Sequence, residues 1–216
     1  MTQPRPHRGP AVCQPFNLAA LAPSAWKNGG GQTREIVCWP PGSAMENFGF
    51  RISVADVVRD GPFSAFSGMD RHILLLEGAG MRLCSPQWGI DHRLEPRGAP
   101  FAFAGDAPLQ CTLLEGACRD FNVMVRRDQW RASVEVAAQA CTAPAGSTGL
   151  CMAMEGSWQP DGGRPLQRHQ GLWWHALDHA LTVTPMAAPA RLVWVVLVPA
   201  ADNARQRSNS DGAPPR

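Results

Sequence analysis

Apolar and polar residues alternate in short runs along most of this chain, and Gly, Pro and Asp separate the runs. In residues 48–58, for example, Phe50, Ile52 and Val54 fall on one face of an extended strand, while Arg51 falls on the other. Comparable runs predict strands at residues 34–39, 73–76, 81–84, 101–104, 111–114, 121–125, 149–154, 172–175, 180–184 and 191–198. Short strands at this spacing predict an all-β fold, an antiparallel sandwich or barrel.

The remaining segments carry weaker patterns. Residues 1–14 read as a loose leader and residues 201–216 as a frayed, disordered tail. Residues 128–139 have some helical character, although Val134 and Val136 fit a strand as well.

Composition and charge exclude several classes of protein. Of the 216 residues 44% are hydrophobic, which suffices for a packed core, and the net charge of +2 gives no basic face for nucleic acid. The longest strongly apolar run, residues 192–198, is far shorter than the roughly 20 residues of a membrane-spanning helix. No signal peptide is recognisable, and the seven cysteines include no C-x-x-C pair. We therefore expect a cytoplasmic protein with reduced thiols, no membrane contact and no nucleic-acid partner.

Neither a metal site nor a phosphate-binding loop is predicted. His175 and His179 are four residues apart, but Ala176 stands where a zinc protease would carry Glu, and no H-x-H pair occurs. The glycines of residues 29–31 follow Lys27, whereas a P-loop places its Lys after them. Three glycines in a row more simply predict a turn that enters a strand and lets the backbone approach a ligand or another strand closely.

The candidate binding residues lie on the polar faces of two predicted strands. Arg51 shares its face with Ser53, and a guanidinium that points into a barrel needs an anion, for which a planar carboxylate is well shaped. The alternatives are that Arg51 points to solvent, or that it pairs with Glu35 or Asp56. Asp120 shares one face of its strand with Asn122 and Met124, in residues 120–125, and would add acceptors and donors if the two faces meet.

The motifs of residues 26–127 resemble those of the HutD/Ves family. Residues 26–36, WKNGGGQTREI, are similar to the family's W-[KR]-N-G-G-G-x-T-R-E-I signature, and residues 50–55, FRISVA, to its next strand, with Phe in place of Trp. Further blocks follow in the family's order at residues 61–66, 75–78, 100–106 and 120–124. The resemblance implies a cupin-type antiparallel β-barrel arranged as a bicupin, with one barrel over residues 15–127 and a smaller, second cupin-like barrel over residues 128–200.

The resemblance also implies a function. HutD members are associated with histidine utilisation, so we expect a non-catalytic regulator that binds a small carboxylate metabolite such as urocanate or formiminoglutamate, with no cofactor or metal and with a homodimer as a possible assembly. The residues that match the family's polar positions or share their strand faces are Arg51, Asn28, Glu35, Ser53, Asp120 and Asn122. Two alternatives stay open: a metal-independent isomerase or hydrolase with Glu35 or Asp120 as general base, and a stress-linked protein-interaction module that uses exposed Trp and Phe side chains.

Overall fold

The computed structural model describes residues 11–44 and 47–200, and antiparallel strands form nearly all of the regular structure in them. The all-β prediction is confirmed. Two short 3-10 helices, Leu18–Ala20 and Pro86–Trp88, are the remaining elements of this part, and no helix in it is both long and apolar enough to cross a membrane. The tail predicted over residues 201–216 and the first ten residues of the predicted leader lie outside the described residues.

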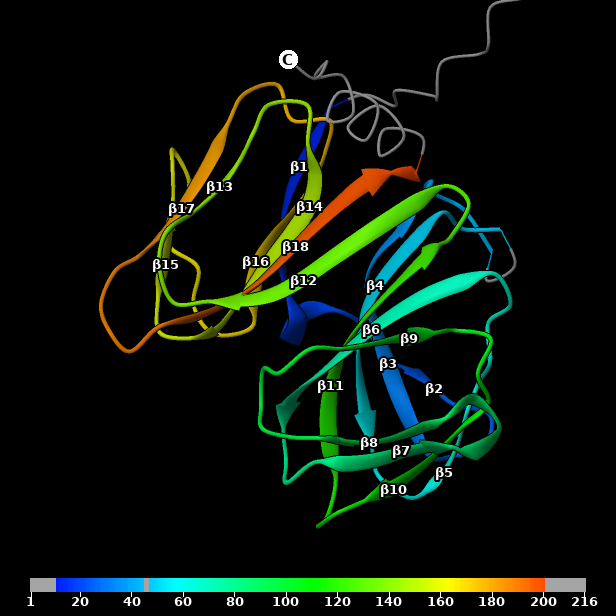
Figure 1. Ribbon diagram of the computed structural model, residues 1–216. Helices are drawn as coiled ribbons and strands as arrows, with labels where there is room; N and C mark the ends of the chain where they lie inside the picture. Colours follow the sequence, from blue (N-terminus) through cyan, green and yellow to red (C-terminus); the bar gives the residue numbers. More distant parts are fainter. Residues whose placement is uncertain (1–10, 45–46, 201–216) are drawn as a thin grey trace, which may run out of the picture. The chain divides into compact units, whose positions relative to one another are not determined.

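The described residues form two compact units (Figure 1). The larger unit comprises Leu21–Ser133 and the described residues from Val198 onward. The smaller unit comprises Val134–Leu197 and the described residues up to Ala20. Each unit is built from antiparallel strands arranged in two sheets.

The larger unit contains a six-stranded and a four-stranded sheet. The order in the first is β2 (Ser24–Ala25), β3 (Gly31–Trp39), β4 (Phe50–Val57), β11 (Cys118–Arg126), β6 (Met69–Glu77) and β9 (Phe101–Ala104). The order in the second is β5 (Gly61–Phe63), β10 (Leu109–Leu113), β7 (Met81–Ser85) and β8 (Ile90–Leu94). The core of this unit, which includes Phe63, Ile73, Leu83 and Leu109, draws buried side chains from both sheets. Each such side chain stabilises the fold by about 1.5–3 kcal/mol.

The smaller unit contains a five-stranded and a three-stranded sheet. The first has the order β1 (Val12–Asn17), β16 (Gln170–His175), β14 (Thr148–Glu155), β18 (Arg191–Pro199) and β12 (Trp130–Ala137), so that β12 and β18 continue past the unit's bounds. The second has the order β13 (Cys141–Ala143), β17 (Leu181–Pro185) and β15 (Trp158–Pro160). Its core is centred on the fully buried Trp158 and Trp174.

Two segments differ from the sequence-based reading. Residues 12–14, assigned there to the leader, begin β1, which pairs with β16 in register Val12↔His175. Residues 130–137, which showed some helical character, form β12 with its Val134 and Val136 in the strand. In both segments sheet pairing decides the structure, because a weak local pattern gives little intrinsic preference for helix or coil.

The inward face of the six-stranded sheet changes character along its length. At one end Val57, Ile73 and Cys118 belong to the apolar core. Further along the same faces of β4, β6 and β11 stand polar residues, among them Ser53 and Asn122, which are opposite each other in register. This change from apolar to polar side chains positions the candidate site.

Candidate functional site

A cavity of about 450 Å³ lies at the polar end of this inward face. Its volume is in the range typical of small-molecule sites. The walls come from β4, β6 and β11, from residues 24–28 with Thr33, and from residues 62–66. The residues that line it are Ser24, Trp26, Lys27, Asn28, Thr33, Arg51, Ser53, Ala55, Pro62, Phe63, Ser64, Phe66, Arg71, Asp120, Asn122 and Met124.

Five of the six residues singled out from the sequence line this cavity, namely Asn28, Arg51, Ser53, Asp120 and Asn122. The register of β4 with β11 brings four of them together, because it places Ser53 opposite Asn122 and Ala55 opposite Asp120. The two polar faces that the sequence suggested therefore meet. The sixth residue, Glu35, is not part of the wall.

Glu35 acts on the cavity through Arg51. The Arg51 Nε donates to Glu35 Oε2 at 2.7 Å, so one of the ion pairs considered for Arg51 is formed. Asp56, the other partner considered, accepts instead from Arg34 and Arg119. The Arg51 side chain is 13% exposed, and the ion pair fixes it at the wall of the cavity.

Asn28 belongs to the glycine-rich turn that enters β3. Its Oδ1 accepts a hydrogen bond from the Gly30 amide at 2.9 Å, and Gly29 has a φ of +66°, a conformation that favours glycine. At Gly31 the backbone approaches β4 so closely that a β-carbon would lie 2.2 Å from the Asp56 carbonyl oxygen. The turn predicted from the sequence is confirmed, and the backbone that Gly31 approaches is that of a neighbouring strand.

The most buried cationic side chain of the cavity, Arg71, was missed in the sequence. It is 5% exposed, and its guanidinium carbon lies 5.1–6.0 Å from the ring centres of Phe63, Phe66 and Phe103. Burial lowers the pKa of Arg71 to about 10, while the nearby Asp120 opposes the shift, so the group is still a cation at neutral pH. Its Nε has no hydrogen-bond partner among the described residues.

A signal for Arg71 was present in the alternation of the strand. The sequence placed the start of this strand at Ile73, whereas β6 starts at Met69. Two residues before Ile73 on the same face stands Arg71, so extending the strand by one repeat would have put an arginine in line with Ile73 and Leu75. The run of four apolar residues concealed it, because a strand buried on both faces shows no alternation.

A directed chain of hydrogen bonds joins Arg71 to Asp120. The Arg71 Nη2 donates to Asn122 Oδ1 at 2.9 Å, and Asn122 Nδ2 donates to Asp120 Oδ1, also at 2.9 Å. Asp120 is fully buried, and its Oδ2 has no partner among the described residues. Burial raises the pKa of Asp120 to about 7, although the hydrogen bond from Asn122 and the charge of Arg71 lower it.

The titration of Asp120 predicts a pH-dependent stability. Its pKa in the folded protein, about 7, lies above the ordinary 3.8, so between these values the folded state holds a proton that the unfolded state has released. The free energy of unfolding should therefore fall as the pH rises through this window, by at most about 1.4 kcal/mol per pH unit. Urea unfolding at pH 5 and pH 8 should show this loss for the wild type relative to Asp120→Asn. Equal pH dependence in both proteins would contradict the assignment.

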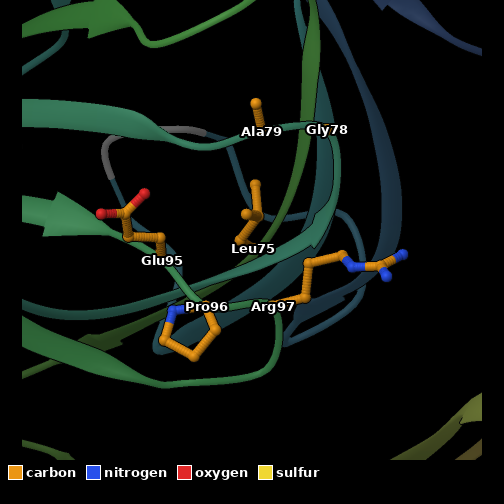
Figure 2. A pocket seen from close by; sticks show the side chains of 6 residues that line it. All are labelled: Leu75, Gly78, Ala79, Glu95, Pro96 and Arg97. Carbon is orange, nitrogen blue, oxygen red and sulfur yellow. The ribbon is translucent and has the colours of Figure 1, made fainter.

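Figure 2 shows a second hollow, of about 500 Å³, bordered by Leu75, Gly78, Ala79, Glu95, Pro96 and Arg97. Its two charged side chains, Glu95 and Arg97, point away from each other, and the Glu95 carboxylate accepts from Arg93 Nε at 2.8 Å. Polar groups that converge on a ligand are the mark of a binding site. The cavity beside Arg71 has them, and this hollow does not.

Metal ligands and reactive thiols do not form a further site in residues 11–44 and 47–200. No group of three or more His, Cys, Asp or Glu side chains in this part is placed to hold a metal ion. Burial raises the pKa values of Cys111 and Cys151 to about 12, so both thiols are protonated at neutral pH. Both side chains belong to the apolar cores.

Comparison with known proteins places these features in a family. The sequence model of the HutD family matches residues 18–191. The Protein Ves of Citrobacter koseri is 39% identical over 167 residues, which cover 77% of this chain and 85% of that protein.

Solved structures agree with this match. HutD from Pseudomonas fluorescens SBW25 has a TM-score of 0.75 and 29% identity, over 87% of this chain and 99% of that one. A cupin 2 conserved barrel domain protein from Leptotrichia buccalis has a TM-score of 0.55 at 10% identity, over 86% of this chain and 96% of that one, and so shares the cupin fold.

Proposed function

Because the chain belongs to the HutD/Ves family and has a cupin-type fold, we propose that it binds a small carboxylate metabolite and regulates histidine utilisation without catalysing a reaction. The ligand occupies the cavity beside Arg71 and Arg51. An intermediate of histidine degradation, such as urocanate or formiminoglutamate, has the required carboxylate.

The observation that carries this proposal is the burial of Arg71 together with its incomplete hydrogen bonding. A guanidinium that is 5% exposed, lines a cavity and has an Nε without a partner in the part of the chain that the structure describes calls for an anion with hydrogen-bond acceptors. Asp120, the nearest internal anion, reaches it only through Asn122. A carboxylate is planar and can accept two parallel N–H groups, so it fits this guanidinium better than a chloride or a water does.

The other walls suit a small, partly flat acid. Arg51 supplies a second guanidinium, and Phe63, Phe66 and Trp26 supply apolar surface against which a planar group can pack. Ser53 and Asn28 supply polar atoms that can fix the orientation of the ligand.

Regulation without turnover is supported by the chemistry of the lining. Neither a His nor a Cys is among the residues that line the cavity, and its serines have no imidazole base beside them in the wall. A site that holds a metabolite without a nucleophile–base pair is suited to sensing its concentration.

One observation favours a second function, a metal-independent acid–base enzyme. Asp120 is fully buried in the cavity wall, its Oδ2 has no partner among the residues described, and its pKa is about 7, which are the properties of a general acid or base. Glu35 is a weaker candidate for this role, because it is outside the wall and bound to Arg51. Turnover of a histidine-pathway intermediate by pure protein, lost in Asp120→Asn, would establish the enzyme and refute the non-catalytic regulator.

A thermal-shift panel tests the binding proposal. The panel contains urocanate, formiminoglutamate, formylglutamate, glutamate and histidine, each with wild-type protein and with Arg51→Ala. A ligand at 100 times its dissociation constant should add about 2.7 kcal/mol to the free energy of unfolding. We expect this shift with one of the intermediates, reduced in Arg51→Ala. The absence of a shift with every member would separate this chain from histidine catabolism.

A further inference from the structure

We propose that the ligand of this cavity has two functional ends, a carboxylate for Arg71 and an N–H hydrogen-bond donor for Asp120. The inference deepens the proposed function and rests on it, because it presumes that the cavity binds a small carboxylate. A ligand with a carboxylate alone would satisfy Arg71 but leave Asp120 without a donor. The compounds that this inference selects are small acids with an imidazole, imino or amide N–H at a distance from the carboxylate.

The Arg71–Asn122–Asp120 chain of hydrogen bonds has a fixed direction. The Asn122 amide turns its oxygen to the guanidinium, at 2.9 Å from Arg71 Nη2, and its NH₂ group to the carboxylate, at 2.9 Å from Asp120 Oδ1. A guanidinium can only donate and an ionised carboxylate can only accept, so this orientation of the amide is the one that satisfies both neighbours.

Each end of this chain leaves one buried atom without a partner among the described residues. These atoms are Arg71 Nε, a donor, and Asp120 Oδ2, an acceptor when the carboxyl is ionised. Their residues are 5% and 0% exposed and line the same cavity. Leaving a charged group buried without its hydrogen bonds is costly, so a molecule that fills both needs gains affinity at both ends.

Two different groups on the ligand are required, because the two atoms have opposite hydrogen-bonding character. A carboxylate accepts from Arg71 Nε but would repel the ionised Asp120. An N–H group donates to Asp120 Oδ2 but cannot accept from Arg71 Nε. Asn122 bridges the two residues with bonds of 2.9 Å, so both open atoms lie within the span of one small molecule.

The charges around Asp120 are compatible with an ionised carboxylate in the complex. Arg71 on β6 favours the anion, and Asp56 on β4 opposes it. An N–H donor from the ligand would add a second hydrogen bond to the anion, beside that of Asn122, and so favour ionisation further. A carboxyl that stayed protonated would instead donate from Oδ2, and would then prefer a ligand without the N–H group.

The test compares two acids that differ in the donor. Urocanate and trans-cinnamate share a planar acrylate, but the imidazole of urocanate carries an N–H group that the phenyl ring of cinnamate lacks. Isothermal titration calorimetry at pH 8 should show that urocanate binds the wild type tighter by a factor of about 10–100, the usual range for a hydrogen bond to a charged group. In Asp120→Asn this ratio should collapse at least tenfold, because urocanate loses the charged acceptor of its N–H group, whereas cinnamate, no longer repelled by the Asp120 charge, should bind no more weakly than it binds the wild type.

The outcomes distinguish a failure of the two-ended ligand from a failure of carboxylate binding. If both acids bind wild type but the ratio is the same in Asp120→Asn, the two-ended ligand is refuted and carboxylate binding stands. If neither acid binds wild type and no member of the thermal-shift panel does, carboxylate binding itself is refuted, and the inference with it. N-methylurocanate, which lacks the N–H group but keeps the ring, gives the same comparison on wild-type protein alone should Asp120→Asn not fold. Affinity equal to that of urocanate would overturn the inference.

Discussion

Replacing Arg71 by methionine should weaken carboxylate binding about 100-fold while leaving the protein folded. Charge-assisted hydrogen bonds in a buried site contribute about 1.5–3 kcal/mol each, and tenfold in affinity is about 1.4 kcal/mol, so losing two of them gives this factor or more. The fold should tolerate the change, because methionine is flexible enough to pack among Phe63, Phe66 and Phe103, and Asp120 can take up a proton when its cation is lost.

The matched control is Arg82→Met. Arg82 lies in the same unit but is half exposed, on β7, where it pairs with Asp91 at 2.6 Å. Surface pairs of this kind contribute little to stability, so both stability and ligand affinity should stay close to wild type. Titration calorimetry with urocanate measures the affinities. Wild-type affinity in Arg71→Met would show that the carboxylate binds elsewhere in the cavity, at Arg51 or Lys27.

Replacing Gly31 by alanine should destabilise the larger unit by about 3 kcal/mol or more. The β-carbon would lie 2.2 Å from the Asp56 carbonyl oxygen and 3.3 Å from the Trp26 ring. Because the first contact is with backbone, relief requires β3 to move away from β4, which disturbs the hydrogen bonds at the start of this strand pair. Overpacking costs about 1–3 kcal/mol, and loss of strand pairing adds to that.

Gly61→Ala separates the steric effect from the general effect of a glycine substitution. Gly61 is also the first residue of a strand, β5, but no atom lies within 4 Å of a β-carbon placed there. Urea unfolding should therefore give nearly wild-type stability for Gly61→Ala and a strong loss for Gly31→Ala. Similar values for the two variants would mean that β3 and β4 can separate at little cost.

The sequence predicted the cavity-lining residues of β4 and β11 better than Arg71 on β6. Alternation in residues 48–58 put Arg51 and Ser53 on one face of β4, and the structure places both at the cavity. Asp120 and Asn122 were grouped in the same way on β11. These residues could be predicted because side chains alternate between the two faces of a strand, so the sequence of one strand shows which residues share a face.

Neither the position of Arg71 in the cavity nor the ion pair of Arg51 could be predicted from the sequence, for different reasons. β6 is buried on both faces over Ile73–Leu76, so its pattern does not show where the strand begins or which face is internal. The ion pair with Glu35 depends on the pairing of β3 with β4, which includes a register shift between Glu35 and Val37. The pattern of one strand does not show such a shift, because a bulge is an extra residue in one strand relative to its partner and is visible only when the two strands are paired.

The polar part of the inward face of the six-stranded sheet lies on a backbone that strand pairing fixes. Arg71, Asp120, Asn122 and Ser53 are all mid-strand residues whose backbone is held on both sides by neighbouring strands. Under the proposed function, the ligand would contact side chains whose backbone is fixed by strand pairing, and its binding would leave the sheet undeformed. A signal to another molecule would then have to pass through the parts of the wall that lie outside β4, β6 and β11, namely residues 24–28 and 62–66.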